Sequence, residues 1–229
     1  MLNYKKNLEL LTRNHIYSKE MEHDACGVGL IASTEGKKSR AVVEYGIEAL
    51  KAVWHRGAVD ADGKTGDGAG IHVEIPKDFF IEKIEVTGHD YDNSEICVGM
   101  IFLPRNDYSA QESCKTIVES ELTKNNFSIY GWRQVPVNPK VLGEKAFQTM
   151  PEIIQVLFKS NDQNLLDKNL ERKIYETRKK IENKAFNLSL NNFYVCSISS
   201  KSIIYKGMFL AEAISDFYLD LKDKRFISR

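Results

Sequence analysis

The sequence has no net charge, because 32 lysine and arginine residues are balanced by 32 aspartate and glutamate residues. A chain without a basic excess has no global field to attract nucleic-acid phosphates, and one without an acidic excess does not concentrate cations. A small, neutral or zwitterionic partner therefore suits this chain better than nucleic acid does.

Long apolar runs are also missing. No window approaches the roughly 18 apolar residues of a membrane-spanning helix, so we expect no membrane association. The polar segment 1–22 has only a broken apolar patch at Leu8, Leu10 and Leu11, far short of the roughly 7–15 apolar residues of a secretory signal. We expect a cytoplasmic protein whose N-terminal leader has another purpose.

Cysteine is scarce and scattered. The four cysteines form neither a CxxC pair nor a Cys/His group with zinc spacing; they are Cys26, Cys97, Cys114 and Cys196. We therefore expect no metal site and a reducing compartment.

What is present is an ordinary globular composition, with 42% hydrophobic and 28% charged residues in 229. We expect stacked α and β layers around one core in a single domain. Apolar periodicity predicts helices at 39–54, 109–124, 167–185 and 210–217, and strands at 26–33, 69–75, 96–103, 127–135, 153–158, 193–199 and 202–206, the last two paired as a hairpin.

Segment 56–70 is a long irregular loop with five glycines and three aspartates. Loops of this length in compact domains tend to be functional, and glycines let backbone N–H groups approach a ligand. The alternative is a solvated turn in which His55 and Arg56 complement the carboxyl end of a helix. A calcium loop is disfavoured, because the Asp-x-Asp-Gly run that ends at Gly63 lacks the later glutamate.

Cys26 opens a predicted strand directly behind the leader. It is either a small buried hydrophobic residue or a nucleophile. If the chain were cleaved after Ala25, the freed α-amine, with a pKa of roughly 7.7–8.0, would serve as base for the thiol, as in N-terminal nucleophile enzymes.

Two blocks carry a family resemblance. Glu22-His-Asp-Ala-Cys-Gly-Val-Gly-Leu-Ile-Ala32 and His55-Arg-Gly-Ala-Val-Asp-Ala-Asp-Gly-Lys-Thr-Gly-Asp-Gly-Ala-Gly-Ile71 resemble the start of the large (alpha) subunit of glutamate synthases. Blocks at 131–136, 141–144, 193–197 and 205–208 resemble the same family in the same order. The resemblance extends from about Cys26 to Arg229.

The resemblance implies that residues 26–229 are the N-terminal part of a class II glutamine amidotransferase domain, with residues 1–25 a propeptide. The implied fold is α+β: an Ntn-hydrolase-like, four-layer αββα sandwich that is incomplete at its C-terminus. The implied reaction is hydrolysis of L-glutamine to glutamate and ammonia, the ammonia aminating 2-oxoglutarate in glutamate biosynthesis and ammonia assimilation.

Site residues follow from the same resemblance. Cys26 matches the nucleophile and Arg56 the arginine beside it. The active-site loop would comprise His55, Gly57, Gly66, Asp67 and Gly68. The carboxylate anchor for glutamine and the oxyanion pair are expected after Arg229, so the chain alone is expected to be inactive.

No cofactor is expected in this chain, whereas FMN and an iron–sulfur cluster are implied for a full-length parent. The implied partners are the rest of the large subunit and a small subunit. Two alternatives remain: a non-catalytic assembly or regulatory module, and another cysteine hydrolase that pairs Cys26 with His55 or His72.

Overall fold

The computed structural model describes residues 2–14, 27–53 and 57–229. Short 3₁₀ turns, η2 to η4, join some of the elements near the C-terminus and around the loop before α5. The longer elements, in chain order, are α1 (Leu2–Asn14), α2 (Arg40–Ala52), β1 (Ala69–Glu74), α3 (Lys77–Val86), β2 (Cys97–Leu103), α4 (Tyr108–Lys124), β3 (Phe127–Gln134), α5 (Glu144–Thr149), β4 (Glu152–Ser160), α6 (Asp167–Asn187), β5 (Tyr194–Ser199), β6 (Ser202–Gly207) and α7 (Ile214–Phe217).

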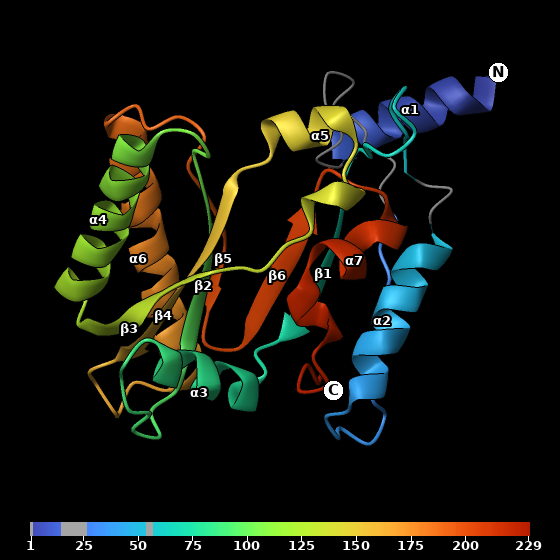
Figure 1. Ribbon diagram of the computed structural model, residues 1–229. Helices are drawn as coiled ribbons and strands as arrows, with labels where there is room; N and C mark the ends of the chain where they lie inside the picture. The colour runs from blue at the N-terminus through green and yellow to red at the C-terminus, as the bar shows by residue number, and fades with distance from the viewer. Residues whose placement is uncertain (1, 15–26, 54–56) are drawn as a thin grey trace.

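The two sheets, with α4 and α6 on one side and α2 on the other, stack in four layers, helix, sheet, sheet and helix (Figure 1). The larger sheet has the order β3-β4-β2-β5 and the smaller sheet pairs β1 with β6, every neighbouring pair being antiparallel. Helices α4 and α6 cover the outer face of the larger sheet, and α2 packs on β1 at the opposite side. The predicted α+β, four-layer αββα sandwich is confirmed.

Hydrophobic residues form two clusters, where we expected one core. The first lies between the two sheets and extends to α2 and α3, and the second lies between the larger sheet and α4 and α6. Successive side chains of β2 alternate between them, Val98 and Met100 entering the first and Cys97 and Ile101 the second. A strand buried on both faces reads as a continuous apolar run, which is the pattern at 96–103.

Helix α6 shows why the predicted helices form. Its buried residues recur every three or four positions, so they make one stripe facing the sheet: Leu170, Ile174, Thr177, Ile181 and Ala185. At the start of α4, the Asp107 side chain accepts a hydrogen bond from the backbone N–H of Ala110, which caps the helix.

The predicted hairpin at 193–206 is wrong, although both strands exist. Strand β5 is at the edge of the larger sheet, whereas β6 pairs with β1 in the other sheet. The connection is a corner between layers, held by Glu171 of α6. One carboxylate oxygen of Glu171 accepts hydrogen bonds from the N–H and the hydroxyl of Ser200, and the other accepts one from the hydroxyl of Ser199.

Replacing Glu171 by alanine is expected to lower the free energy of unfolding by about 1–3 kcal/mol, because Ser200 is buried and would lose its acceptor. Urea denaturation measures the change. Glu171→Gln keeps one oxygen acceptor and should cost less. An equal midpoint for Glu171→Ala and the unmodified chain would show that the corner does not depend on this carboxylate.

The predicted strand at 26–33 is also wrong for its described part. Residues 27–33 have no regular secondary structure, and Val28 and Leu30 are 91% and 89% exposed. An apolar run becomes a strand only where a neighbouring strand supplies a hydrogen-bond ladder, and the described ladders of β1 involve β6 alone.

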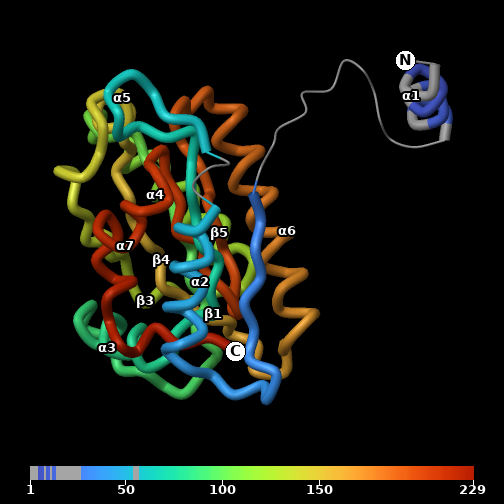
Figure 2. The backbone as a smooth tube through the Cα atoms, turned by 90° about the vertical axis from the view of Figure 1, so that its right-hand side faces the viewer, coloured from blue at the N-terminus to red at the C-terminus, as the bar shows by residue number. Residues whose placement is uncertain are grey.

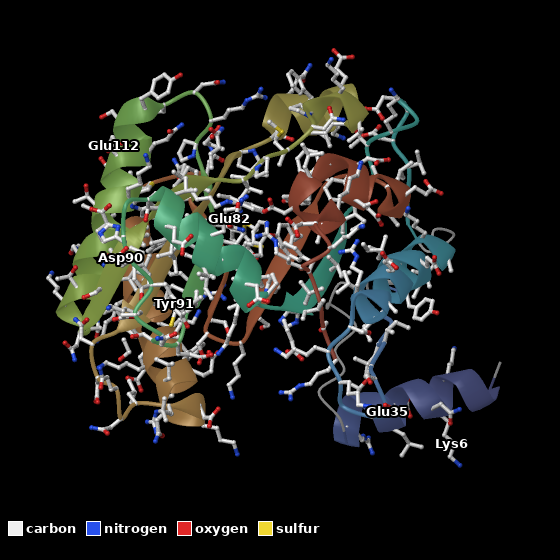
Figure 3. All side chains as sticks on the ribbon, turned by 60° about the horizontal axis from the view of Figure 1, so that its bottom comes forward. Lys6, Glu35, Glu82, Asp90, Tyr91 and Glu112 are labelled. Atoms are coloured by element: carbon white, nitrogen blue, oxygen red, sulfur yellow. The ribbon has the colours of Figure 1, made fainter. Side chains whose placement is uncertain are left out.

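Some elements were not predicted. Helix α1 lies within the expected leader and stands apart from the body in Figure 2. Helix α3 follows β1 and closes one end of the sandwich, with Phe79, Phe80 and Ile84 buried and Glu82 toward the surface (Figure 3). No helix in the described part of the chain is both long enough and apolar enough to cross a membrane.

Candidate functional site

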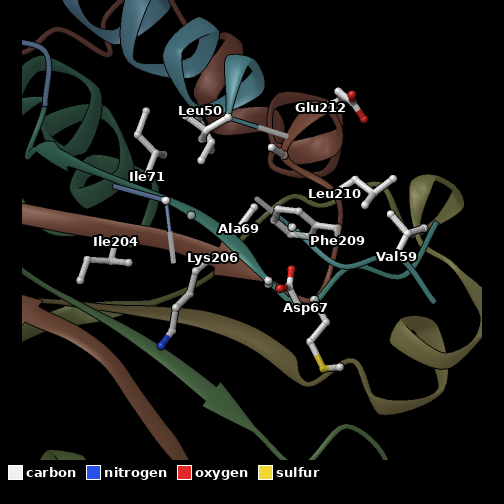
Figure 4. A pocket seen from close by; sticks show the side chains of 18 of the residues that line it. Leu50, Val59, Asp67, Ala69, Ile71, Ile204, Lys206, Phe209, Leu210 and Glu212 are labelled. Atoms are coloured by element: carbon white, nitrogen blue, oxygen red, sulfur yellow. The ribbon is translucent and has the colours of Figure 1, made fainter. Parts of the chain in front are cut away.

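A cleft of about 900 Å³ lies around the first residues of β1 (Figure 4). Its lining comes from Gly27, the end of α2, loop 57–68, β1, Phe102 of β2, β6 and the segment 208–212 that follows β6. Pockets that bind small molecules commonly have roughly 300–1,000 Å³. The cleft therefore has room for a ligand of amino-acid size.

The floor of the cleft is the β1–β6 pair. Gly70 lies opposite Lys206 in the register, and a Cβ atom at Gly70 would come within 2.8 Å of the Lys206 Cβ. Ile71, opposite Tyr205, turns toward α2, where a Cβ atom at Gly46 would lie 3.5 Å from it. Gly70 therefore has to be small because β6 lies so close to it.

Loop 57–68 folds back on itself as two short arms. Val59 and Gly66 form an isolated bridge, and the N–H of Asp67 donates to the carbonyl of Ala58 at 3.2 Å. Gly66 is buried under the segment that follows β6, where a Cβ atom would lie 2.7 Å from the carbonyl oxygen of Phe209. Only glycine fits there, so the loop rests directly on the opposite wall of the cleft.

Hydrogen bonds lower the pKa values of two loop carboxylates, Asp60 and Asp62. A hydrogen bond from the Thr65 hydroxyl lowers the pKa of Asp62 well below its ordinary value, with further help from the N–H groups of Thr65 and Lys64. A hydrogen bond from Lys145 lowers the pKa of Asp60. Both groups are poor candidates for a proton donor at neutral pH. Within the described ranges, no group of three or more His, Cys, Asp or Glu side chains is arranged to hold a metal ion.

Among the residues that the structure describes, His72 and Lys206 are the basic side chains that line the cleft. The Lys206 ammonium lies 4.5 Å from the centre of the Tyr194 ring and donates to its hydroxyl at 2.6 Å, pointing away from Asp67 (Figure 4). His72 Nε2 lies 2.6 Å from the Ser202 hydroxyl oxygen, across the β1–β6 ladder. His72 therefore has a structural partner on the neighbouring strand.

The predicted site residues divide into two groups. Cys26, His55 and Arg56 lie outside the described residues. Their chain neighbours Gly27 and Gly57 both line the cleft.

The described members of the expected active-site loop are Gly57, Gly66, Asp67 and Gly68. Gly57, Asp67 and Gly68 line the cleft. Gly66 does not line the cleft, because it packs against the backbone of Phe209 in the segment that follows β6.

Sequence reasoning missed the wall formed by residues 206–212. This wall includes Lys206, Met208 and Leu210, and no periodicity or charge pattern marks it as part of a site. The available signal was the block at 205–208, which contributed only to the family resemblance.

The chain is similar to proteins of one family. A family model described as "Glutamine amidotransferases class-II" matches residues 26–229. The "Glutamate synthase [NADPH] large chain" of Azospirillum brasilense is 53% identical over 225 residues, 98% of this chain. "Ferredoxin-dependent glutamate synthase 1, chloroplastic/mitochondrial" of Arabidopsis thaliana is 40% identical over 209 residues, and "Ferredoxin-dependent glutamate synthase 2" of Synechocystis sp. is 38% identical over 208, each covering 90% of the chain.

These relatives are much longer than the matched region. The chain spans 15% of the Azospirillum protein and 13% of each of the other two. The similarity therefore concerns one domain of those proteins.

Proposed function

Because the chain belongs to the class II glutamine amidotransferases, we propose that it hydrolyses the side-chain amide of L-glutamine, giving glutamate and ammonia. The observation that carries this proposal is the cleft, which is lined by Gly27 and Gly57, the residues that follow Cys26 and Arg56 in the chain. Two segments far apart in the sequence thus meet at one cavity of suitable size.

The proposed reaction runs in two steps. The Cys26 thiol attacks the amide carbon, its proton passes through the Cys26 α-amine to the leaving nitrogen, and ammonia departs to leave a thioester. Water then attacks the thioester, and its proton returns to the sulfur as glutamate is released. Arg56 is proposed to orient the reacting groups from beside the thiol.

Cys26 becomes N-terminal only if residues 1–25 are removed as a propeptide. Helix α1 is consistent with such a segment, because it lies apart from the four layers (Figure 2) and buries no described side chain. Residues 26–229 are then proposed as the N-terminal part of the amidotransferase domain.

The relatives suggest the larger context. We propose that the chain is the glutaminase part of a glutamate synthase, that its ammonia aminates 2-oxoglutarate, and that it works with the rest of a large subunit and with a small subunit. We also propose a cytoplasmic location. The described cysteines are free thiols, as a reducing compartment would maintain; they are Cys97, Cys114 and Cys196.

FMN and an iron–sulfur cluster would belong to other parts of such an enzyme. The described cysteines do not fit a cluster, because Cys97 lies on β2, Cys114 on α4 and Cys196 on β5, each buried, with no metal-holding group among the described residues.

Maturation tests the mechanism directly. The complete enzyme made in its own host, in which this chain is joined to the rest of the proposed large subunit, is expected to have lost Met1 to Ala25, so that intact mass places Cys26 at the N-terminus. It is also expected to release glutamate and ammonia in equal amounts from glutamine. An active species that retains Met1 would exclude the α-amine as base. A processed species without glutaminase activity would contradict the proposed function.

A further inference from the structure

Loop 57–68 is fixed on the side away from the cleft by a buried polar contact with α5. The Thr65 side chain is 2% exposed. Its hydroxyl donates to Asp62 Oδ2 at 2.6 Å and accepts from the N–H of Ala146 at 3.3 Å. Asp62 Oδ1 accepts from the N–H groups of Thr65 and Lys64 at 2.7 and 2.9 Å. The tip of the loop is thus joined to the first turn of α5.

Gly143, the residue before α5, makes this contact possible. A Cβ atom there would lie 2.2 Å from Asp62 Oδ2, 2.4 Å from the Thr65 hydroxyl oxygen and 2.6 Å from the Thr65 nitrogen. Its φ of −72° is open to every residue, so space alone requires glycine. Gly143 lies in the block at 141–144, which the proposed reaction leaves unexplained.

Backbone hydrogen bonds between the two arms of the loop connect Thr65 to the residues that line the cleft. The N–H of Asp60 donates to the carbonyl of Thr65 at 2.9 Å, and the N–H of Asp67 donates to that of Ala58 at 3.2 Å. The two arms joined in this way carry the cleft-lining residues, Gly57 among them. A tip that shifted relative to α5 would carry both arms with it.

We propose that Thr65, Asp62 and Gly143 form a clamp that positions loop 57–68, and with it the chain at Gly57, for glutamine hydrolysis. The three are positioning residues, because they contact the loop tip and α5 and do not line the cleft. The expected effect on glutamine hydrolysis rests on the proposed function. The existence of the clamp can be tested separately, by hydrogen exchange.

The main test is Thr65→Val, which keeps the shape of the side chain and removes its hydroxyl. In protein made in its own host, kcat for glutamine hydrolysis should fall by about 10²-fold, because a small displacement of positioned groups has an effect of this size. Thr65→Ser, which keeps the hydroxyl, should have a kcat close to that of the unmodified protein. Thr149→Val is the matched control, since Thr149 lies on the exposed side of the same helix and bonds only within it.

Hydrogen exchange of the 229-residue chain separates this inference from the proposed function. In Thr65→Val, the amides of Asp60 and Asp67 should exchange about 10-fold faster or more, because the arms open locally, while amides of β2 and β4 keep their protection. Thr65→Ser should exchange like the unmodified chain. Gly143→Ala should reproduce the Thr65→Val pattern with the hydroxyl still present.

Unchanged exchange at Asp60 and Asp67 in both Thr65→Val and Gly143→Ala would overturn the clamp, whatever happens to activity. Failure of Thr65→Ser to restore turnover, or an equal loss in Thr149→Val, would overturn the positioning role. If the complete unmodified enzyme from its own host hydrolyses no glutamine, the proposed function fails, and the exchange result alone decides whether the clamp exists.

Discussion

Replacement of Cys26 by serine is expected to lower the rate of glutamine hydrolysis by about 10³-fold or more, because a hydroxyl is a far weaker nucleophile than a thiol assisted by an α-amine. Any ammonia-dependent synthesis by the same protein should continue, since supplied ammonia bypasses the cleft. Glutamate release and ammonia-dependent turnover are measured on the same preparation. Loss of both activities would point to a folding role for Cys26.

The other three cysteines are expected to be unreactive, so that Cys26 alone acts as the nucleophile. Cys97, Cys114 and Cys196 are buried. Burial raises the pKa of Cys114 and of Cys196 to about 11, and that of Cys97 further still. These three thiols are therefore protonated at neutral pH, and a protonated thiol is a poor nucleophile.

A glutamine-shaped electrophile should accordingly label the processed protein once, at Cys26. Labelling should disappear in Cys26→Ser and persist in the control Cys196→Ser. Peptide mapping by mass spectrometry locates the label. A label found on Cys97, Cys114 or Cys196 would contradict the selective activation of Cys26.

Replacement of Arg133 by alanine should produce the largest loss of stability, about 3–5 kcal/mol in the free energy of unfolding. Two guanidinium nitrogens of Arg133 donate to the two carboxylate oxygens of Asp220 at 2.8 and 2.7 Å, and one of them also donates to Gln155. The Arg133 and Asp220 side chains are only 11% and 3% exposed. Removing the arginine leaves a buried carboxylate whose charge has lost its partner.

Urea denaturation measures this loss. Arg172→Ala is the control, because the Arg172–Glu176 pair is 80% and 53% exposed and should contribute roughly 0–1 kcal/mol. The double replacement Arg133→Met, Asp220→Leu should be less destabilising than Arg133→Met alone, since no unpaired charge remains. Equal losses for Arg133→Ala and Arg172→Ala would contradict a stabilising role for the buried pair.

Residues from two of the blocks that carry the family resemblance, 131–136 and 205–208, form hydrogen bonds with Asp220. Arg133 belongs to the segment 131–136, and the Tyr205 hydroxyl, from the block at 205–208, donates to Asp220 Oδ2 at 3.1 Å. The block at 193–197 forms most of β5. These three segments therefore have structural roles, in the Arg133–Asp220 network and in strand β5.

The sequence by itself determined the family and most of the local elements, but not helices α1, α3 and α5. Helices α2, α4 and α6 and the described strands from β1 to β6 lie within a few residues of the predicted ranges. Their formation depends on apolar stripes and runs within each segment, which are visible without knowledge of the partner. The blocks at 22–32 and 55–71 indicated a class II glutamine amidotransferase, and the match over residues 26–229 confirms the family.

Only the tertiary structure decided how the strands pair. Strands β5 and β6 looked like a hairpin because a two-residue connection favours one, yet the buried corner at Ser200 sends them to different sheets. Residues 27–33 have the composition of a strand and form none in the described chain. A ladder requires a neighbour with free N–H and C=O groups, and that neighbour comes from a distant part of the chain.

The cleft and the clamp were likewise decided by tertiary contacts. Composition indicated a functional loop at 56–70, but Lys206 lies on β6, the rest of that wall follows β6, and Gly143 contacts the loop from just before α5. A local pattern records what a segment buries or exposes. Close approach between segments depends on how four layers stack, and a single sequence does not reveal the resulting distances.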